Sequence, residues 1–236
     1  MSVVVSVEDL EQRIGSKVVL DRVSFEVSEG ECFGVFGPKG CGKSTLLHIL
    51  AGIDRFKKGK VRICDLDIGK TEKYRASLGL VTQRPSLFRD LRVGENLDFI
   101  AALKDVGREN VLAVVDRFCL EDFLDKPLTA LYAGEFQRLS MACAMLNDPK
   151  VLILDEPISR LDLESSRVIL REIKDFLSGG GACVWAFSGG VGLFQHMDRV
   201  AWLEGGGITI YSPQEAGREW DRQVEALSLE SGVGDV

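Results

Sequence analysis

Residues 32–51 read CFGVFGPKGCGKSTLLHILA. The apolar run at 32–36 predicts a buried strand, the glycine-rich stretch 37–42 predicts a loop, and residues 43–51 predict a helix. The spacing Gly-x4-Gly-Lys-Ser is typical of a loop whose backbone N–H groups turn inward around an anion at a helix N-terminus. The sequence therefore predicts a phosphate-binding loop between a strand and a helix.

Two side chains of this loop carry specific expectations. Lys43 is expected to reach the β- and γ-phosphates of a nucleotide, and Ser44 is expected to bind Mg²⁺. The other residues expected to contact the nucleotide are Gly37, Pro38, Lys39, Gly40, Cys41, Gly42 and Thr45.

A second stretch carries an acidic pair. Residues 151–154 are four consecutive apolar residues, typical of a strand buried on both faces of a parallel sheet, and Asp155 and Glu156 follow them. Ligands of open α/β sheets bind at this carboxyl edge. We expect Asp155 to hold Mg²⁺ and Glu156 to orient and polarise an attacking water.

Strand and helix patterns alternate along the chain, which predicts an α/β fold. Residues 97–123 have helical spacing, with Leu112 expected on a buried face, and residues 228–236 are expected to fray. The other expected strands are 3–7, 18–27 with a break at Asp21 and Arg22, 61–63, 78–82, 183–187 and 200–203. The other expected helices are 165–177 and 213–227.

Composition narrows the class of protein. With 236 residues, of which 45% are hydrophobic, the chain can bury a sizeable core without metal or crosslinks. A net charge of −7 argues against a nucleic-acid partner. The six cysteines form no CxxC pair and only two histidines accompany them, so zinc is not expected. No apolar run approaches the ~18 residues of a membrane span, so any work at a membrane needs a partner.

Three further stretches stand in a recognisable order. Gln83 lies in GLVTQRP at 79–85, LYAGEFQR lies at 131–138, and SRLD lies at 159–162. Together with the loop and the acidic pair, they make the chain resemble an ATP-binding subunit of an ABC transporter over about residues 3–212.

The resemblance implies a RecA-like P-loop NTPase core with an N-terminal antiparallel β-subdomain and an inserted helical subdomain at about 86–140. Residues 1–212 would form the ATP-binding domain, and 213–236 a C-terminal helix and flexible tail. Gln83 would join the metal site to the helical insertion, as a metal ligand and catalytic residue beside Lys43 and Glu156.

Four positions depart from the family pattern. Tyr132 stands where the family has a signature serine, and Ala133 where it has a glycine. Ile14 stands near the place of an aromatic residue that stacks on adenine. Residues 186–190, AFSGG, lack the family's switch histidine, and His48 and His196 are interpreted as structural and surface residues. We therefore expect ATP binding to survive better than turnover.

The resemblance implies that MgATP binding and hydrolysis drive a separate membrane permease, with the chain at the cytoplasmic face as a homodimer or a heterodimer with a second ATP-binding subunit. Leu87, Phe88 and Leu91 are candidates for the permease contact. Residues 91–99 resemble subunits of ABC-2-type exporters. A soluble regulatory or assembly ATPase of the same family, or an ATP-locked scaffold, remains an alternative. The sequence does not define the cargo or the direction of transport.

Overall fold

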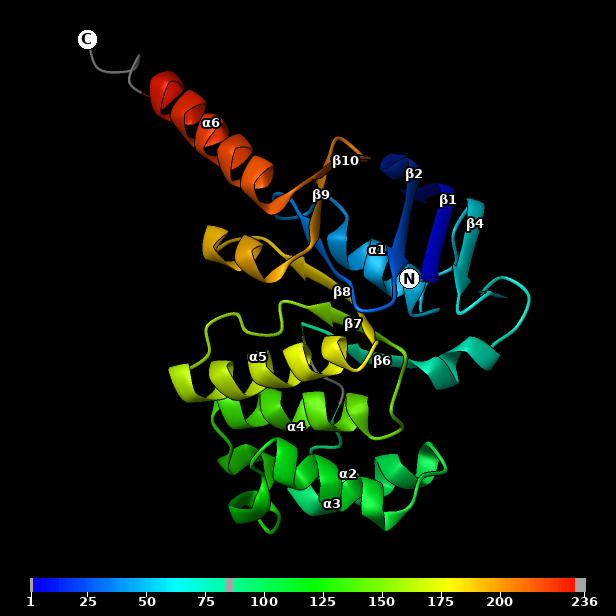
Figure 1. The fold of residues 1–236 in the computed structure, drawn as a ribbon, viewed down its shortest axis with the longest axis vertical. Helices are drawn as coiled ribbons and strands as arrows, with labels where there is room; N and C mark the ends of the chain where they lie inside the picture. The colour runs from blue at the N-terminus through cyan, green and yellow to red at the C-terminus, as the bar shows by residue number, and fades with distance from the viewer. Residues whose placement is uncertain (1, 84–86, 232–236) are drawn as a thin grey trace.

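A six-stranded sheet forms the centre of the computed structural model, which describes residues 2–83 and 87–231 (Figure 1). Its strand order is β10-β9-β3-β8-β7-β6, and β10 alone runs antiparallel to its neighbour. The strands are β3 (Cys32–Phe36), β6 (Leu78–Val81), β7 (Val151–Asp155), β8 (Ala182–Phe187), β9 (Arg199–Glu204) and β10 (Gly207–Tyr211). Strand β10 was not predicted from the sequence.

The central strands consist mainly of apolar residues because they are buried on both faces. Every residue of β3, β7 and β8 is buried, which is why these segments are continuous apolar runs instead of alternating patterns. In register, Phe36 pairs with Phe187, and Asp155 pairs with Ala186. The loop after β3 and the acidic pair after β7 therefore emerge at the same edge of the sheet.

A second, antiparallel sheet has the order β2-β1-β4-β5. Its strands are β1 (Val3–Ile14), β2 (Lys17–Ser28), β4 (Lys58–Ile63) and the short β5 (Leu66–Asp67). The predicted break at Asp21 and Arg22 is wrong: β2 runs through it, with pairs to β1 on both sides. Arg22 takes a left-handed φ of 51°, so an irregularity within the strand absorbs the polar pair.

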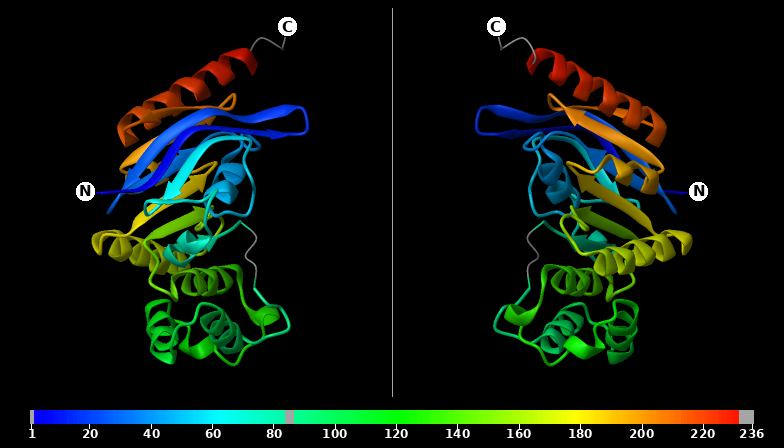
Figure 2. Two further views of the ribbon diagram at one scale, coloured as in Figure 1. Left: turned by 90° about the vertical axis from the view of Figure 1, so that its right-hand side faces the viewer. Right: turned by 90° about the vertical axis from the view of Figure 1, so that its left-hand side faces the viewer.

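Six α-helices are found in the described part of the chain (Figure 2). They are α1 (Lys43–Leu50), α2 (Val93–Leu103), α3 (Arg108–Arg117), α4 (Ala133–Met145), α5 (Leu163–Ser178) and α6 (Pro213–Ser231). Helices α2 and α3 lie at the end of the molecule opposite α6 (Figure 1). None of the helices among residues 2–83 and 87–231 combines the length and apolarity that crossing a membrane requires.

The predicted helical stretch 97–123 is divided. Helix α2 ends before Asp105, which has a left-handed φ of 54°, and α3 begins after Gly107. A short 3-10 helix, Glu121–Phe123, follows. Leu112 is 57% exposed, so its predicted burial is wrong: the neighbouring Val111 and Val115 supply the buried face of α3. Within the predicted fraying segment, α6 continues to Ser231, and residues 232–236 lie outside the described part.

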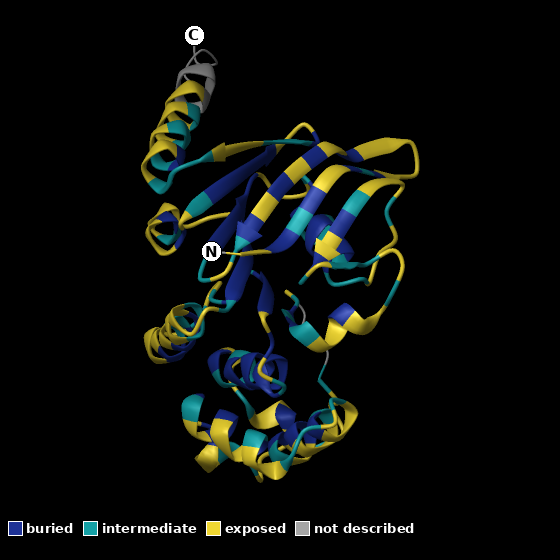
Figure 3. Cartoon of the chain, turned by 45° about the vertical axis from the view of Figure 1, so that its right-hand side comes forward, coloured by how far each residue is buried: buried dark blue, intermediate teal, exposed yellow. Residues whose placement is uncertain are grey.

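The central sheet separates two hydrophobic cores. Its buried strands are dark blue in Figure 3. Leu152 and Leu154 face a core shared with α4 and α5, whereas Ile153 faces a core shared with α1 and the antiparallel sheet. Burying both faces fixes the sheet, and with it the edge where the loop and the acidic pair meet. The predicted α/β class with an N-terminal antiparallel sheet is confirmed.

An aromatic cluster anchors that edge. The ring of Phe36 lies against four others, with centroid distances of 5.2 Å to Phe187, 5.1 Å to Phe194, 4.7 Å to Trp202 and 5.6 Å to Trp220. The cluster joins the residue that precedes the glycine-rich loop to strands β8 and β9 and to helix α6.

Candidate functional site

The glycine-rich loop adopts a backbone that other residues could not take. Gly37 has a φ of 156°, and a Cβ there would lie 2.3 Å from the carbonyl oxygen of Leu203. Gly42 has a φ of 120°, and a Cβ there would lie 2.8 Å from Val19. Glycine is required at both positions, because a side chain would either strain the backbone or displace its neighbour.

Lys43 begins α1 and is nearly buried, at 7% exposure. Its Nζ donates to the carbonyl oxygens of Gly37 at 2.7 Å and Pro38 at 3.1 Å. Among the residues that the structure describes, no carboxylate forms an ion pair with this ammonium group. An ammonium group that is buried without a counter-charge favours an anionic ligand beside it.

Ser44 and Asp155 lie side by side across the sheet edge. The Ser44 hydroxyl and Asp155 Oδ2 are 2.7 Å apart, and Asp155 is only 4% exposed. A hydroxyl and a buried carboxylate are hard oxygen donors of the kind that Mg²⁺ prefers. The structure thus brings together two of the three predicted metal ligands.

Glu156 follows Asp155 with a left-handed φ of 56°. Its N–H donates to the carbonyl oxygen of Ala186 at 2.9 Å, and its Oε1 accepts a hydrogen bond from the Ser188 hydroxyl. Ser188 was not among the predicted site residues. The sequence signal that points to it is its position directly after β8, at the edge of the sheet that also carries Asp155.

A cavity of about 980 Å³ joins these groups. Of the predicted residues, it is lined by Ile14, Lys39, Gly40, Gly42, Lys43, Ser44, Thr45, Gln83, Asp155 and Glu156. Gln83 is exposed, and Ile14 is 60% exposed at the tip of the β1–β2 hairpin. Gly37, Pro38 and Cys41 are not among the lining residues: the first two hold Lys43, and Cys41 packs against the core around α1.

The N-terminus of α4 borders the same cavity through Leu131, Ala133, Phe136 and Gln137. Tyr132 precedes the helix and is 81% exposed. Its backbone N–H donates to Glu135 Oε2 at 2.8 Å, but the Tyr132 side chain itself forms no capping hydrogen bond. The half of the cap that a serine hydroxyl would supply is therefore missing.

The start of α4 fits closely against the start of α5. A Cβ at Gly134 would lie 2.1 Å from Asp162 Oδ2 and 2.2 Å from the Ser165 hydroxyl. Asp162 caps α5 by accepting from the Ser165 backbone N–H at 2.7 Å. That hydrogen bond holds the pKa of Asp162 below its ordinary value. The two helix starts thus form one closely packed unit beside the cavity.

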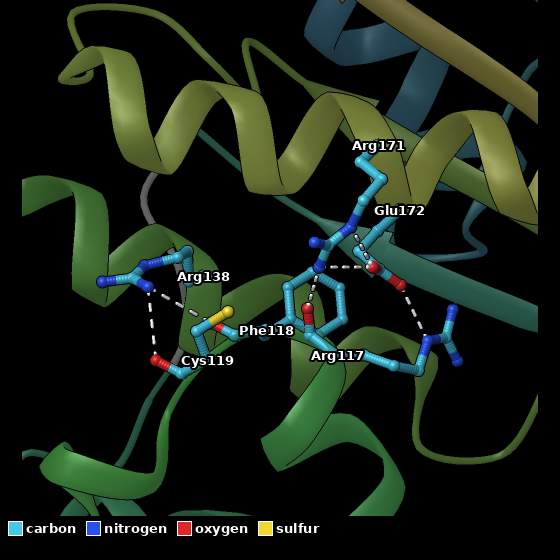
Figure 4. Close-up of polar contacts among 6 residues, drawn as sticks. All are labelled: Arg117, Phe118, Cys119, Arg138, Arg171 and Glu172. Carbon is cyan, nitrogen blue, oxygen red and sulfur yellow. Dashed lines mark hydrogen bonds and ion pairs between the residues drawn. The ribbon is translucent and has the colours of Figure 1, made fainter.

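A charged cluster ties α3 and α4 to α5 (Figure 4). Glu172 is almost fully buried and accepts from Arg117 Nε at 2.7 Å, and Arg171 Nε donates to its other oxygen at 3.1 Å. Arg138, on α4, is also buried and donates to the carbonyl oxygens of Phe118 at 3.4 Å and Cys119 at 3.2 Å. The cluster connects the helices beyond the cavity to the helix that follows the acidic pair.

Neither histidine lines the cavity. His48 Nδ1 lies 3.4 Å from Asp54, and His196 is an exposed residue whose ring stacks over Trp185. Partial burial lowers the pKa of His196 from its ordinary value. These positions agree with the structural and surface interpretations of the two residues.

An apolar surface lies beyond Gln83. Phe88 is 44% exposed and packs edge-on against the half-exposed Phe99 at 4.7 Å, while Leu87 is half-buried against the core. Leu87 lines a smaller cavity of about 310 Å³ with Ile53, Ile100 and Lys104. Burial lowers the pKa of Lys104 to about 8. Arg84 and Pro85, in the stretch that carries Gln83, lie outside the described residues.

Comparisons with solved structures identify proteins of the same fold. A structure described as an ATP-binding subunit of an ABC transporter superposes with a TM-score of 0.84 at 22% identity, covering 96% of this chain and 98% of that one. The dimeric structure of MJ0796, a bacterial ABC transporter cassette, gives a TM-score of 0.80 at 23% identity, covering 89% and 98%. At these identities, the likeness shows the fold.

Sequence comparisons identify relatives. The Fe(3+) ion import ATP-binding protein FbpC of Fusobacterium nucleatum is 30% identical over 74% of this chain and 49% of its own length. The Nod factor export ATP-binding protein I of Ralstonia nicotianae is 34% identical over 75% and 57%. The chain thus spans about half the length of these relatives. The ABC transporter ATP-binding protein YhcH of Bacillus subtilis is 34% identical over 87% and 68%.

A family model described as ABC transporter matches residues 20–159, which run from β2 past the acidic pair. The match covers more than half of the chain and includes Lys43, Gln83 and Asp155. The chain therefore belongs to the ABC transporter family.

Proposed function

We propose that this chain is an ATP-binding subunit that couples MgATP binding and hydrolysis to substrate movement by a separate permease. One observation carries the proposal: Lys43, the Ser44–Asp155 pair and Glu156 converge on one cavity of about 980 Å³. Phosphoryl transfer to water requires a group that binds phosphate, oxygen ligands for the metal ion and a carboxylate that orients the water.

The residues present fit a nucleotide and its metal ion. Gly37 and Gly42 allow the tight turn of the loop, where a Cβ would collide with Leu203 or Val19. Lys43 supplies positive charge without a carboxylate partner among the described residues. Ser44, Asp155 and Gln83 would hold Mg²⁺, which when bound neutralises phosphate charge. Ile14 would contact adenine, and the lack of an aromatic ring there costs up to roughly 1–3 kcal/mol of affinity, by analogy with base stacking elsewhere.

Turnover by the isolated chain should be slow. In the dimer that the family resemblance implies, the exposed Tyr132 and the methyl group of Ala133 would crowd the place where backbone approaches the phosphate of a partner's nucleotide. Losing one transition-state donor, the switch histidine, slows hydrolysis by about 10²–10³, by analogy with deletion of one oxyanion-hole donor. These departures favour a heterodimer in which a second ATP-binding subunit supplies an intact signature opposite Lys43.

The permease would dock on the apolar surface of Leu87, Phe88 and Leu91. The half-exposed ring pair of Phe88 and Phe99, beside a cavity of about 310 Å³, supports this placement. Docking there would hold the chain at the cytoplasmic face of the membrane. The relatives include both import and export proteins, so the exporter subtype stays a prediction.

Two measurements test the proposal. Purified chain should bind MgATP and release phosphate slowly, and it should co-purify from detergent with an integral-membrane protein encoded beside it. Replacement of Phe88 by Ser should weaken that co-purification without changing ATP affinity. Normal ATP binding with no membrane partner under any extraction would favour the alternative of a regulatory or assembly ATPase. Brisk turnover by the isolated homodimer would contradict the impaired signature.

A further inference from the structure

We infer that Ser188 is a positioning residue that holds the carboxylate of Glu156 toward the site of the attacking water. The inference rests on the proposed function, because it assigns a role within the same hydrolytic site. It concerns a residue that was not among the predicted site residues.

The end of β8 holds Glu156 at two points. The backbone N–H of Glu156 donates to the carbonyl oxygen of Ala186 at 2.9 Å. Two residues further along, the Ser188 hydroxyl donates to Glu156 Oε1. Main chain and carboxylate are therefore both held from one strand end, with Glu156 at a left-handed φ of 56°.

Ser188 is itself placed by rigid neighbours. The preceding Phe187 is fully buried and packs against Phe36 at 5.2 Å and Phe194 at 5.6 Å. Phe36 directly precedes the glycine-rich loop, so one aromatic cluster positions both the phosphate cradle and the serine that holds Glu156. Ser188 itself is exposed, but its main chain continues directly from this packed cluster, so its hydroxyl has only a short side chain to order when it orients Glu156.

The chemistry of the hydroxyl limits what it can do. A serine hydroxyl has one proton to donate, and here the acceptor is a carboxylate oxygen, which makes a charge-assisted hydrogen bond. No other hydrogen bond to the Glu156 carboxylate is found among the described residues, so its second oxygen is available to a water. Unlike an imidazole, the hydroxyl carries no positive charge to the transition state. Ser188 therefore supplies orientation without charge stabilisation.

Single-turnover and steady-state hydrolysis by the full chain, with Mg²⁺ and ATP, tests the inference. Ser188→Ala should lower kcat roughly tenfold, the scale of one hydrogen bond to a charged group, with KM unchanged. Ser188→Thr, which keeps the hydroxyl, should retain most of the wild-type kcat. Ser178→Ala, an exposed serine at the end of α5, is the matched control and should behave as wild type.

A double-mutant cycle separates positioning from a general structural effect. In a Glu156→Gln background, adding Ser188→Ala should cause no further loss, because the group that Ser188 orients is gone. An equal loss in both backgrounds, an unchanged kcat in Ser188→Ala, or a Thr variant as slow as the Ala variant would overturn the inference. A wild-type chain that binds MgATP without any hydrolysis would instead refute the proposed activity, and the role of Ser188 with it.

Discussion

The sheet edge and the N-terminus of α4 border the same cavity, but only the sheet edge has its expected polar groups in hydrogen bonds. At the sheet edge, Lys43, the Ser44–Asp155 pair and Glu156 are buried or half-buried and hydrogen-bonded. At α4, Tyr132 is 81% exposed and the helix lacks its side-chain cap. In the proposed dimer, each nucleotide would lie between the first region of one subunit and the second region of the other. One chain can therefore have an intact sheet edge for its own nucleotide and an impaired α4 N-terminus for the nucleotide of its partner.

The largest effect is expected when the positive charge at the sheet edge is removed. Lys43→Ala should abolish MgATP binding, because the loop loses the buried ammonium group that is proposed to bind the phosphates. Isothermal titration calorimetry measures the affinity. Lys57→Ala, at an exposed position outside the cavity, is the control and should bind normally. Unchanged affinity in Lys43→Ala would refute the assigned loop.

The next effect separates binding from turnover within the same region. Glu156→Gln should keep MgATP affinity while lowering phosphate release by about 10²–10³, because an amide is a poor acceptor for a proton from water. A phosphate-release assay at saturating ATP provides the readout. An equal rate in the variant would mean that the water is oriented by another group.

A third change tests how firmly the two regions are connected. Glu172→Gln removes the charge that Arg117 and Arg171 share, and it should lower the free energy of unfolding by about 2–3 kcal/mol. This loss of stability is smaller than for a fully buried ion pair, because both arginines are partly exposed. Thermal denaturation compares it with Glu164→Gln, an exposed residue in the first turn of α5. Equal melting temperatures for the two variants would show that the cluster contributes little.

The smallest effect is expected from a substitution that restores the cap at the N-terminus of α4. Tyr132→Ser restores a capping hydroxyl worth about 1 kcal/mol and removes the ring, so turnover by a homodimer should rise severalfold. Tyr132→Phe keeps the ring and should remain as slow as the wild type. ATPase rates over a range of protein concentrations measure the change. If serine brings no gain, the limitation lies at the sheet edge instead.

Hydrophobic patterns in the sequence predicted correctly those strands whose residues are all buried. The runs at β3, β7 and β8 are apolar throughout because both faces of the sheet are covered, so their burial could be read directly. Leu112 was misjudged because 97–123 looks like one helical pattern, whereas Asp105 ends it and resets the phase of α3. The break predicted at Arg22 failed because a strand can absorb a left-handed residue.

The predicted site residues lie close together because they follow parallel strands whose carboxyl ends share one edge of the sheet. Their positions directly after apolar runs in the sequence are enough to predict this. The hydrogen bond from Ser188 to Glu156 could not be predicted in the same way. It depends on the φ of 56° at Glu156 and on the register of β7 with β8, which only the folded chain defines.

The aromatic cluster gives the molecule an intrinsic optical label. Phe36 adjoins Gly37, and its ring touches Trp202 and Trp220, two of the three tryptophans in the chain. A rearrangement of the loop upon nucleotide uptake would change the surroundings of both indoles. Ultraviolet emission can thus report occupancy in real time, with no dye attached near the cavity.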